Sequence, residues 1–270
     1  MNYKYLFIIL LLFIGTSCED TNELDMVDEL MVQGYLLAGQ TLESIQFKRV
    51  ISFNETEALP APTDLSPVII AEDGTEYLLQ YLGKDGLYGN TELLIEAEKS
   101  YDLEVEYNGE TIKASTFVPA APDSLTITET IIRRTQIRDF TDLQNLSIPD
   151  PIQVDWLGEN GAFYFAQVKN IEANPDPINQ LFIDNGFEPP VLQSEPSTNL
   201  FYLINAFQEI TFFGRHEVII YRVNPEYVNL YDSNDQGSGA LNEIQTNVEN
   251  GFGIFTGVNQ ARIEFEVIRQ

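Results

Sequence analysis

Residues 101–118, YDLEVEYNGETIKASTFV, decide the fold class of this 270-residue chain. From Tyr101 to Tyr107 apolar and acidic residues alternate strictly, which predicts a strand with one buried face and one solvated face. Asn108-Gly109 is a strong signal for a tight hairpin turn, so the chain should return as a second strand over Thr111–Val118. The stretch therefore predicts an antiparallel hairpin in an all-β, or mainly β, protein.

Tyr101 opens its strand directly after the polar turn Glu98-Lys99-Ser100. This position suits a tyrosine corner, in which the hydroxyl of a tyrosine in an immunoglobulin-like sandwich bonds to upstream backbone. An ordinary core tyrosine would also fit there. We interpret residues 30–119 as an N-terminal immunoglobulin/fibronectin-like β-sandwich.

The segments upstream of Tyr101 fit the same fold, because short strands alternate with turns. A further hairpin is expected at Asp73-Gly74. The expected strands are Leu30–Leu37, Ser44–Phe53, Val68–Ala71 and Glu76–Tyr81.

A linker with two prolines, Val118–Asp123, separates this unit from a second β-rich domain over residues 124–270. Asn224-Pro225-Glu226 resembles a helix start, so one short helix is expected at Pro225–Tyr231. Residues 174–196 form a long irregular excursion with one helical turn near Asn179–Ile183. The expected strands are Leu125–Ile137, Ile152–Trp156, Ala162–Ile171, Phe201–Phe213, Glu217–Val223, Phe252–Phe255 and Ala261–Val267.

The N-terminus has the layout of a secretory signal peptide over residues 1–17. Its apolar run, Leu6–Ile14, is shorter than the roughly 20 residues that a membrane-spanning helix needs. Small residues precede Cys18, an arrangement that resembles the lipobox of bacterial lipoproteins, in which the cysteine is acylated. We predict lipidation at Cys18 and an acidic tether over residues 18–29; the alternative is an ordinary signal peptide followed by a chance cysteine.

Composition narrows the class of protein further. The chain carries 42 acidic against 14 basic residues, a net charge of −28, so it should repel nucleic acid and anionic lipid headgroups. Cys18 is the only cysteine, so no disulfide can form within the chain. With 44% hydrophobic and 11% aromatic residues, the protein can be stabilised by a packed core.

No catalytic motif is found. His216 is the only histidine, and the sequence has no Gly-x-Ser-x-Gly elbow, phosphate-binding glycine loop or His-Glu-x-x-His helix. Two carboxylates could hydrolyse a glycoside, but among 42 acids the sequence nominates no pair. We expect His216 to be a structural or surface residue, and the protein to be non-enzymatic and without a cofactor or a resident metal.

One acidic window leaves two interpretations open. Residues 232–243 match a calcium-binding loop at positions 1, 3, 6 and 12, but depart from it at positions 5 and 8. The window is therefore either a calcium site or a polar loop. The matching residues are Asp232, Asn234, Gly237 and Glu243, and the departures are Gln236 and Gly239.

Two other groups of residues could contact a partner. Arg133, Arg134 and Arg138 form a basic cluster, and a strand over 125–137 would place Arg134 and Arg138 on one face. They either satisfy neighbouring carboxylates or meet an acidic partner. Phe182 and Phe187, with the adjoining Pro189-Pro190, form either a sugar or protein contact patch or a loop packed on its own domain.

Six stretches spread over the chain resemble an uncharacterised lipoprotein family of Bacteroidetes, domain of unknown function 4249. They are CED at 18–20, MVQGYL at 31–36, KSYDLEV at 99–105, ASTFVP at 114–119, YRVNPEY at 221–227 and NVENGFGIF at 247–255. The resemblance implies a lipid-anchored protein of the outer membrane that faces the cell exterior and is an accessory of a TonB-dependent transporter or another outer-membrane β-barrel. A free-standing carbohydrate-binding or adhesin lipoprotein is the alternative.

Overall fold

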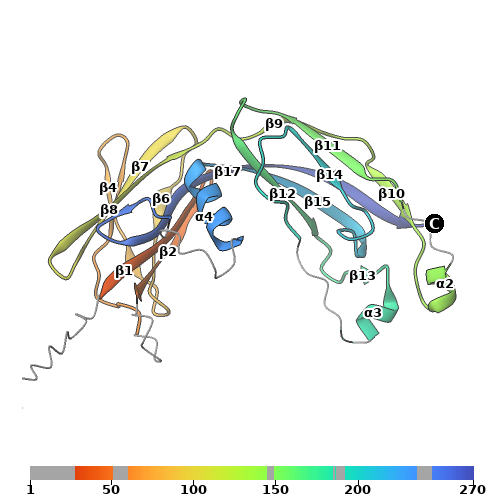
Figure 1. Ribbon diagram of the computed structural model, residues 1–270, viewed down its shortest axis with the longest axis horizontal. Helices are drawn as coiled ribbons and strands as arrows, with labels where there is room; N and C mark the ends of the chain where they lie inside the picture. Colours follow the sequence, from red (N-terminus) through yellow and green to blue (C-terminus); the bar gives the residue numbers. More distant parts are fainter. Residues whose placement is uncertain (1–27, 51–59, 145–148, 185, 187–191, 236–244) are drawn as a thin grey trace, which may run out of the picture.

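The computed structural model describes residues 28–50, 60–144, 149–184, 186, 192–235 and 245–270. Two β-sandwiches lie side by side along the long axis of the molecule (Figure 1). The predicted mainly β fold class is confirmed. No helix in the described ranges is both long and apolar enough to cross a membrane.

The first sandwich packs two sheets around one core. Strands β1, β2, β6 and β5 lie in one sheet, and β8, β7, β3 and β4 lie in the other. Large buried side chains such as Phe47, Tyr88 and Leu103 fill the space between them. The strands are β1 (Glu29–Leu37), β2 (Thr41–Val50), β3 (Val68–Ala71), β4 (Glu76–Leu78), β5 (Gln80–Tyr81), β6 (Leu87–Leu94), β7 (Lys99–Tyr107) and β8 (Glu110–Val118).

The hairpin and the tyrosine corner of this sandwich are as predicted. Strands β7 and β8 pair antiparallel around Asn108 and Gly109, which adopt φ angles of 51° and 83°. The Tyr101 hydroxyl accepts a 2.8 Å hydrogen bond from the backbone N–H of Glu96, five residues upstream. The buried ring of Tyr101 therefore fixes the turn that leads into β7.

The second sandwich also has two sheets, β14-β11-β9 against β12, β15 and part of β17, with Trp156, Tyr164 and Phe213 in its core. It has a second tyrosine corner, in which the Tyr164 hydroxyl accepts a 3.0 Å bond from the N–H of Glu159. The strands are β9 (Asp123–Ile127), β10 (Ile131–Arg134), β11 (Ile152–Leu157), β12 (Phe163–Asn170), β13 (Asp176–Pro177), β14 (Phe201–Ile204), β15 (Phe212–Val223), β16 (Val248–Glu249) and β17 (Phe252–Arg269).

Three helices are described: α2 (Phe140–Gln144), α3 (Gln180–Asp184) and α4 (Pro225–Asp235). Helix α4 begins where the Asn-Pro-Glu pattern predicts, and α3 lies at the expected helical turn. Helix α2 was not expected.

Three segments predicted as single strands are interrupted. Residues 76–81 divide into β4, which pairs with β3, and β5, which pairs with β6 in the other sheet. Residues 125–137 divide into β9, which pairs with β11, and β10, which pairs with β17. The polar residues between β9 and β10 leave the β14-β11-β9 sheet. At the end of β9, the Thr128 hydroxyl accepts a hydrogen bond from the backbone N–H of Gln153. Residues 201–213 divide at a turn in which the Asn205 side chain accepts bonds from two backbone N–H groups, those of Phe207 and Gln208.

Strand β17 joins the two sandwiches, and Figure 1 shows it running from one to the other. Its first part pairs in parallel with β1, from Met31–Phe252 to Leu37–Val258. Its later part pairs antiparallel with β15, so one sheet runs in the order β12-β15-β17-β1-β2-β6-β5. Residues 248–258 therefore complete the first sandwich, although in sequence they lie within the predicted second domain.

Candidate functional site

Several predicted site residues lie outside the described residues. These are Cys18, Phe187, Pro189-Pro190 and most of the calcium-loop window, residues 236–243. The backbone of Asp232–Asp235, the start of that window, continues helix α4. The lipidation and calcium hypotheses thus remain predictions. Within the described ranges, no group of three or more His, Cys, Asp or Glu side chains could hold a metal ion.

His216 is a structural residue in the second sandwich. Its side chain is buried and stacks on Phe265 with a 5.1 Å separation of ring centroids. Nδ1 lies 3.0 Å from the carbonyl oxygen of Gly214, and Nε2 lies 3.2 Å from the amide nitrogen of Asn170. Burial lowers the pKa of His216, so the ring is neutral at pH 7, donating from Nδ1 and accepting at Nε2.

Arg134 and Arg138, predicted to share a strand face, do not share one. Arg134 is only 5% exposed and donates to the backbone carbonyl of Ala206, and burial lowers its pKa. No ion pair to Arg134 occurs among the described residues. Arg138 lies beyond the end of β10, is exposed and donates to Gln136. The predicted pairing of Arg134 with a neighbouring carboxylate is therefore replaced by a bond to backbone.

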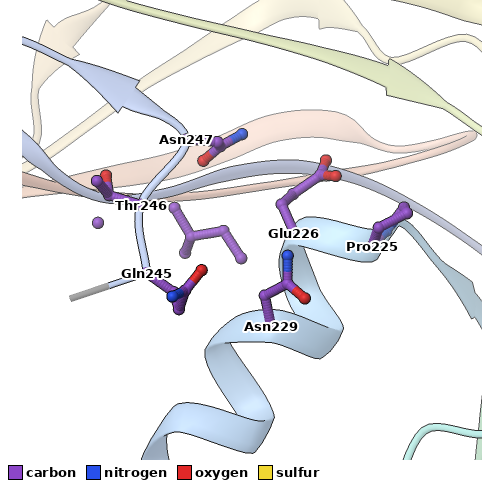
Figure 2. Close-up of a pocket in the computed structure, with 8 residues that line it drawn as sticks. Pro225, Glu226, Asn229, Gln245, Thr246 and Asn247 are labelled. Carbon is purple, nitrogen blue, oxygen red and sulfur yellow. The ribbon is translucent and has the colours of Figure 1, made fainter. Parts of the chain in front are cut away.

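A polar pocket of about 230 Å³ lies beside helix α4, near the join of the two sandwiches (Figure 2). Its lining comes from three segments: the first turns of α4, the residues just before β16, and the start of β17. The lining residues are Pro225, Glu226, Asn229, Gln245, Thr246, Asn247, Gly253 and Ile254.

Two polar residues of this pocket hold the fold together. Glu226 Oε1 accepts bonds from the hydroxyls of Thr116 on β8 and Thr256 on β17, at 3.2 and 3.0 Å. The Asn247 side chain forms paired bonds with the backbone of Phe255, donating at 2.7 Å and accepting at 3.0 Å. These bonds fasten the start of α4 and the approach to β16 onto the shared strand β17.

Two other side chains of the pocket are available to a ligand. The amides of Asn229 and Gln245 are exposed and lie on either side of the pocket in Figure 2, with no hydrogen-bond partner among the described residues. Each amide can both donate and accept. Ile254 adds an apolar side chain to the lining, so the pocket has the size and polarity for a small uncharged ligand such as one sugar ring.

A second polar cluster fixes the start of the fold at Asp28. The Arg49 guanidinium on β2 donates to both carboxylate oxygens of Asp28, at 2.8 and 2.5 Å. The Tyr107 hydroxyl donates to the same carboxylate at 2.7 Å, and the Asn108 amide donates to the Asp28 carbonyl at 3.0 Å. Asp28 is therefore bonded to both sheets of the first sandwich. We call Asp28, Arg49, Tyr107 and Asn108 the Asp28 clamp.

Replacing Asp28 with asparagine should make stability less dependent on pH at the acid end. The hydrogen bond from Arg49 lowers the pKa of Asp28 from 3.8 to about 2. Because the folded pKa lies below the unfolded one, this stabilisation is complete above about pH 5 and is mostly lost as the pH falls to about 2. With about a quarter of each side chain exposed, we expect a loss of about 1–2 kcal/mol at pH 7.

Urea unfolding at pH 7, 4 and 2 measures this effect. The difference between wild type and Asp28→Asn should shrink steadily below about pH 5. A difference that stays constant over the whole range would show that the carboxylate charge contributes nothing.

Sequence reasoning missed the Asp28 clamp and the pocket. Asp28 was assigned to the tether because acids crowd residues 19–29, and nothing local distinguishes it from its neighbours. Its partners lie 21 to 80 residues away. The Asn-Pro-Glu helix start was the one local signal that pointed to the pocket.

Comparison with known proteins gives one family. The family model described as "Domain of unknown function (DUF4249)" matches residues 19–264. No curated protein matches the chain.

Solved structures similar to the chain include a two-domain fibronectin type-III segment of chicken tenascin, 9% identical, which covers 88% of this chain and 98% of that one with a TM-score of 0.26. The FN1–FN3 domains of chicken CNTN1, also 9% identical, cover 89% of this chain and 65% of that one with a TM-score of 0.27. The sandwich architecture described above rests on strand pairing, independently of these weak similarities.

Proposed function

Because the chain belongs to the family of domain of unknown function 4249, matched over residues 19–264, we propose that it is a lipoprotein of the outer membrane that faces the cell exterior. It serves as a non-enzymatic accessory to a TonB-dependent transporter or another outer-membrane barrel. In that role it either captures a nutrient or completes a cell-envelope complex.

The observation that supports this proposal most directly is the short tether between Cys18 and the clamped Asp28. Nine residues lie between them, and the ten residue steps from Cys18 to Asp28 reach about 35 Å when fully extended. A lipid on Cys18 would hold the N-terminal end of β1 close to the membrane. The second sandwich lies at the other end of the long axis (Figure 1), where it could reach a barrel partner or its ligand.

Purification from membranes tests the proposal. The chain, tagged at Gln270 and extracted in mild detergent, should bring down an outer-membrane barrel in stoichiometric amount. A Cys18→Ser variant should move to the soluble fraction and lose the barrel, whereas an Asp28→Asn variant, which keeps the cysteine, should stay in the membrane fraction. Protease added to intact cells should cleave the wild-type chain if it faces the exterior. A Cys18→Ser chain that remains in the membrane would contradict the lipid anchor.

The pocket beside α4 favours the second candidate, a free-standing carbohydrate-binding or adhesin lipoprotein. The amides of Asn229 and Gln245, which have no partner within the described part of the chain, can recognise hydroxyl groups. A chain that purifies without a barrel and binds glycans, with binding lost in Asn229→Ala, would support this candidate over the first.

A further inference from the structure

Strands β1 and β17 are arranged so that tension along the chain acts on them in shear. They run parallel and pair over seven residues, from Met31–Phe252 to Leu37–Val258. The N-terminal end of β1 continues into the tether, and β17 continues from its pairing with β1 through the second sandwich to Arg269. A pull on the tether and an opposite pull on the second sandwich therefore draw the two strands past each other along their length.

The direction of pulling decides how hydrogen bonds share a force. When two paired strands slide along their axes, all bonds between them are loaded together and must break together. When the strands are pulled apart at one end, the bonds break one after another, each under the full force. Breaking the bonds of seven residue pairs together therefore presents a much higher barrier than breaking them one at a time.

Each strand is held by further pairing. On its other side β1 pairs antiparallel with β2, from Glu29–Val50 to Gly34–Ile45. In the second sandwich β17 pairs with β15 from Val258–Val223 to Val267–Gly214, and with β10 near its end. Because β17 crosses both sandwiches, a force that leaves β1 enters the second sandwich without crossing a loop.

The Asp28 clamp reinforces the point at which the tether meets the fold. It holds Asp28 by a bidentate guanidinium–carboxylate pair and by donors from the β7–β8 hairpin. Bidentate pairs of this kind are among the stronger polar interactions. A force on the tether must therefore break the clamp before it reaches the first residue pair of β1.

We propose that β1, β17 and the Asp28 clamp form a tension link. This link transmits mechanical load between the membrane anchor and a partner or ligand bound by the second sandwich. The lipid anchor of the proposed function is where the load enters. The link itself is a property of the folded chain, so it can be tested on purified protein without lipid or partner.

Single-molecule pulling at constant force tests the link on residues 19–270. One handle is attached at residue 19 in both geometries. The second handle is attached at Gln270 for the shear geometry, or through Glu249→Cys for the peeling geometry. Glu249 is exposed and lies just before β17, whose Phe252 pairs with Met31 near the start of β1. At the same force, the lifetime in shear should exceed the lifetime in peeling by at least about tenfold, equivalent to about 1.4 kcal/mol of barrier.

Asp28→Asn should shorten the lifetime in shear several-fold. The lifetime in shear should still exceed the lifetime in peeling. Glu104→Gln is the matched control, since it removes an exposed ion pair with Lys113 (2.6 Å) in the same sandwich but away from β1. Equal lifetimes in the two geometries, or a shorter one in shear, would overturn the tension link. If Asp28→Asn and Glu104→Gln changed the shear lifetime equally, the Asp28 clamp would not be part of the tension link. Neither result depends on whether Cys18 is lipidated, so the proposed function stands or fails separately, on membrane fractionation and co-purification.

Discussion

Gly253→Ala is expected to destabilise the folded chain by about 3–5 kcal/mol, a large fraction of the stability of a typical domain. Gly253 lies at the start of β17 with a φ of 109°, a conformation that residues with a side chain rarely adopt. A Cβ at this position would lie 1.9 Å from the carbonyl oxygen of Val32 on β1. Because that oxygen belongs to backbone, relief requires β1 and β17 to separate.

Gly109→Ala is the matched control for backbone strain. Gly109 also has a positive φ, 83°, but no atom lies within 4 Å of a Cβ built there. It should cost only the conformational penalty of about 1 kcal/mol. Urea unfolding followed by circular dichroism measures both variants. If the two variants lost similar amounts of unfolding free energy, the clash with the Val32 carbonyl on β1 would add nothing to the cost of a positive φ.

The parts of the fold that depend on neighbouring residues could be predicted from the sequence. Alternation from Tyr101 to Tyr107, followed by Asn108-Gly109, was sufficient for the β7–β8 hairpin, because the pattern and the turn agree. The tyrosine corner at Tyr101 followed from its place after a polar turn. The corresponding corner at Tyr164 was not predicted. In the structure, a Cβ on Gly158 would lie 2.3 Å from the Tyr164 hydroxyl, so the turn before Tyr164 requires glycine.

The parts that depend on distant pairing could not be predicted. Residues 252–255 and 261–267 were expected as two strands, because the residues between them do not alternate. The structure has one strand, since the segment 254–259 is buried on both faces where the sandwiches meet. Such a segment lacks the period of two that marks a half-buried strand. For the same reason, no local pattern placed Asp28 beside Arg49 or Glu226 beside Thr116.

Phe255→Ala, in the core of the first sandwich, should also lower the unfolding temperature reported by Trp156, which lies in the core of the second. The Phe255 ring is fully buried, and truncating such a ring costs about 3–5 kcal/mol. For a chain of this size that is a fall of roughly 10 °C. Trp156 is the only tryptophan, so its fluorescence reports on the second sandwich alone.

The coupling follows from the position of Phe255 on the shared strand. Loss of its packing loosens β17, and β17 supplies the strand that β15 pairs with from Val223 to Gly214. If the two sandwiches unfold as one unit, Trp156 fluorescence and circular dichroism should show a single transition at the same lowered temperature. A lowered first transition in circular dichroism with the Trp156 transition unchanged would mean that β17 separates from β1 while the second sandwich stays folded. In that case the β1–β17 pairing would be the weakest part of the molecule, which would also argue against its role as a tension link.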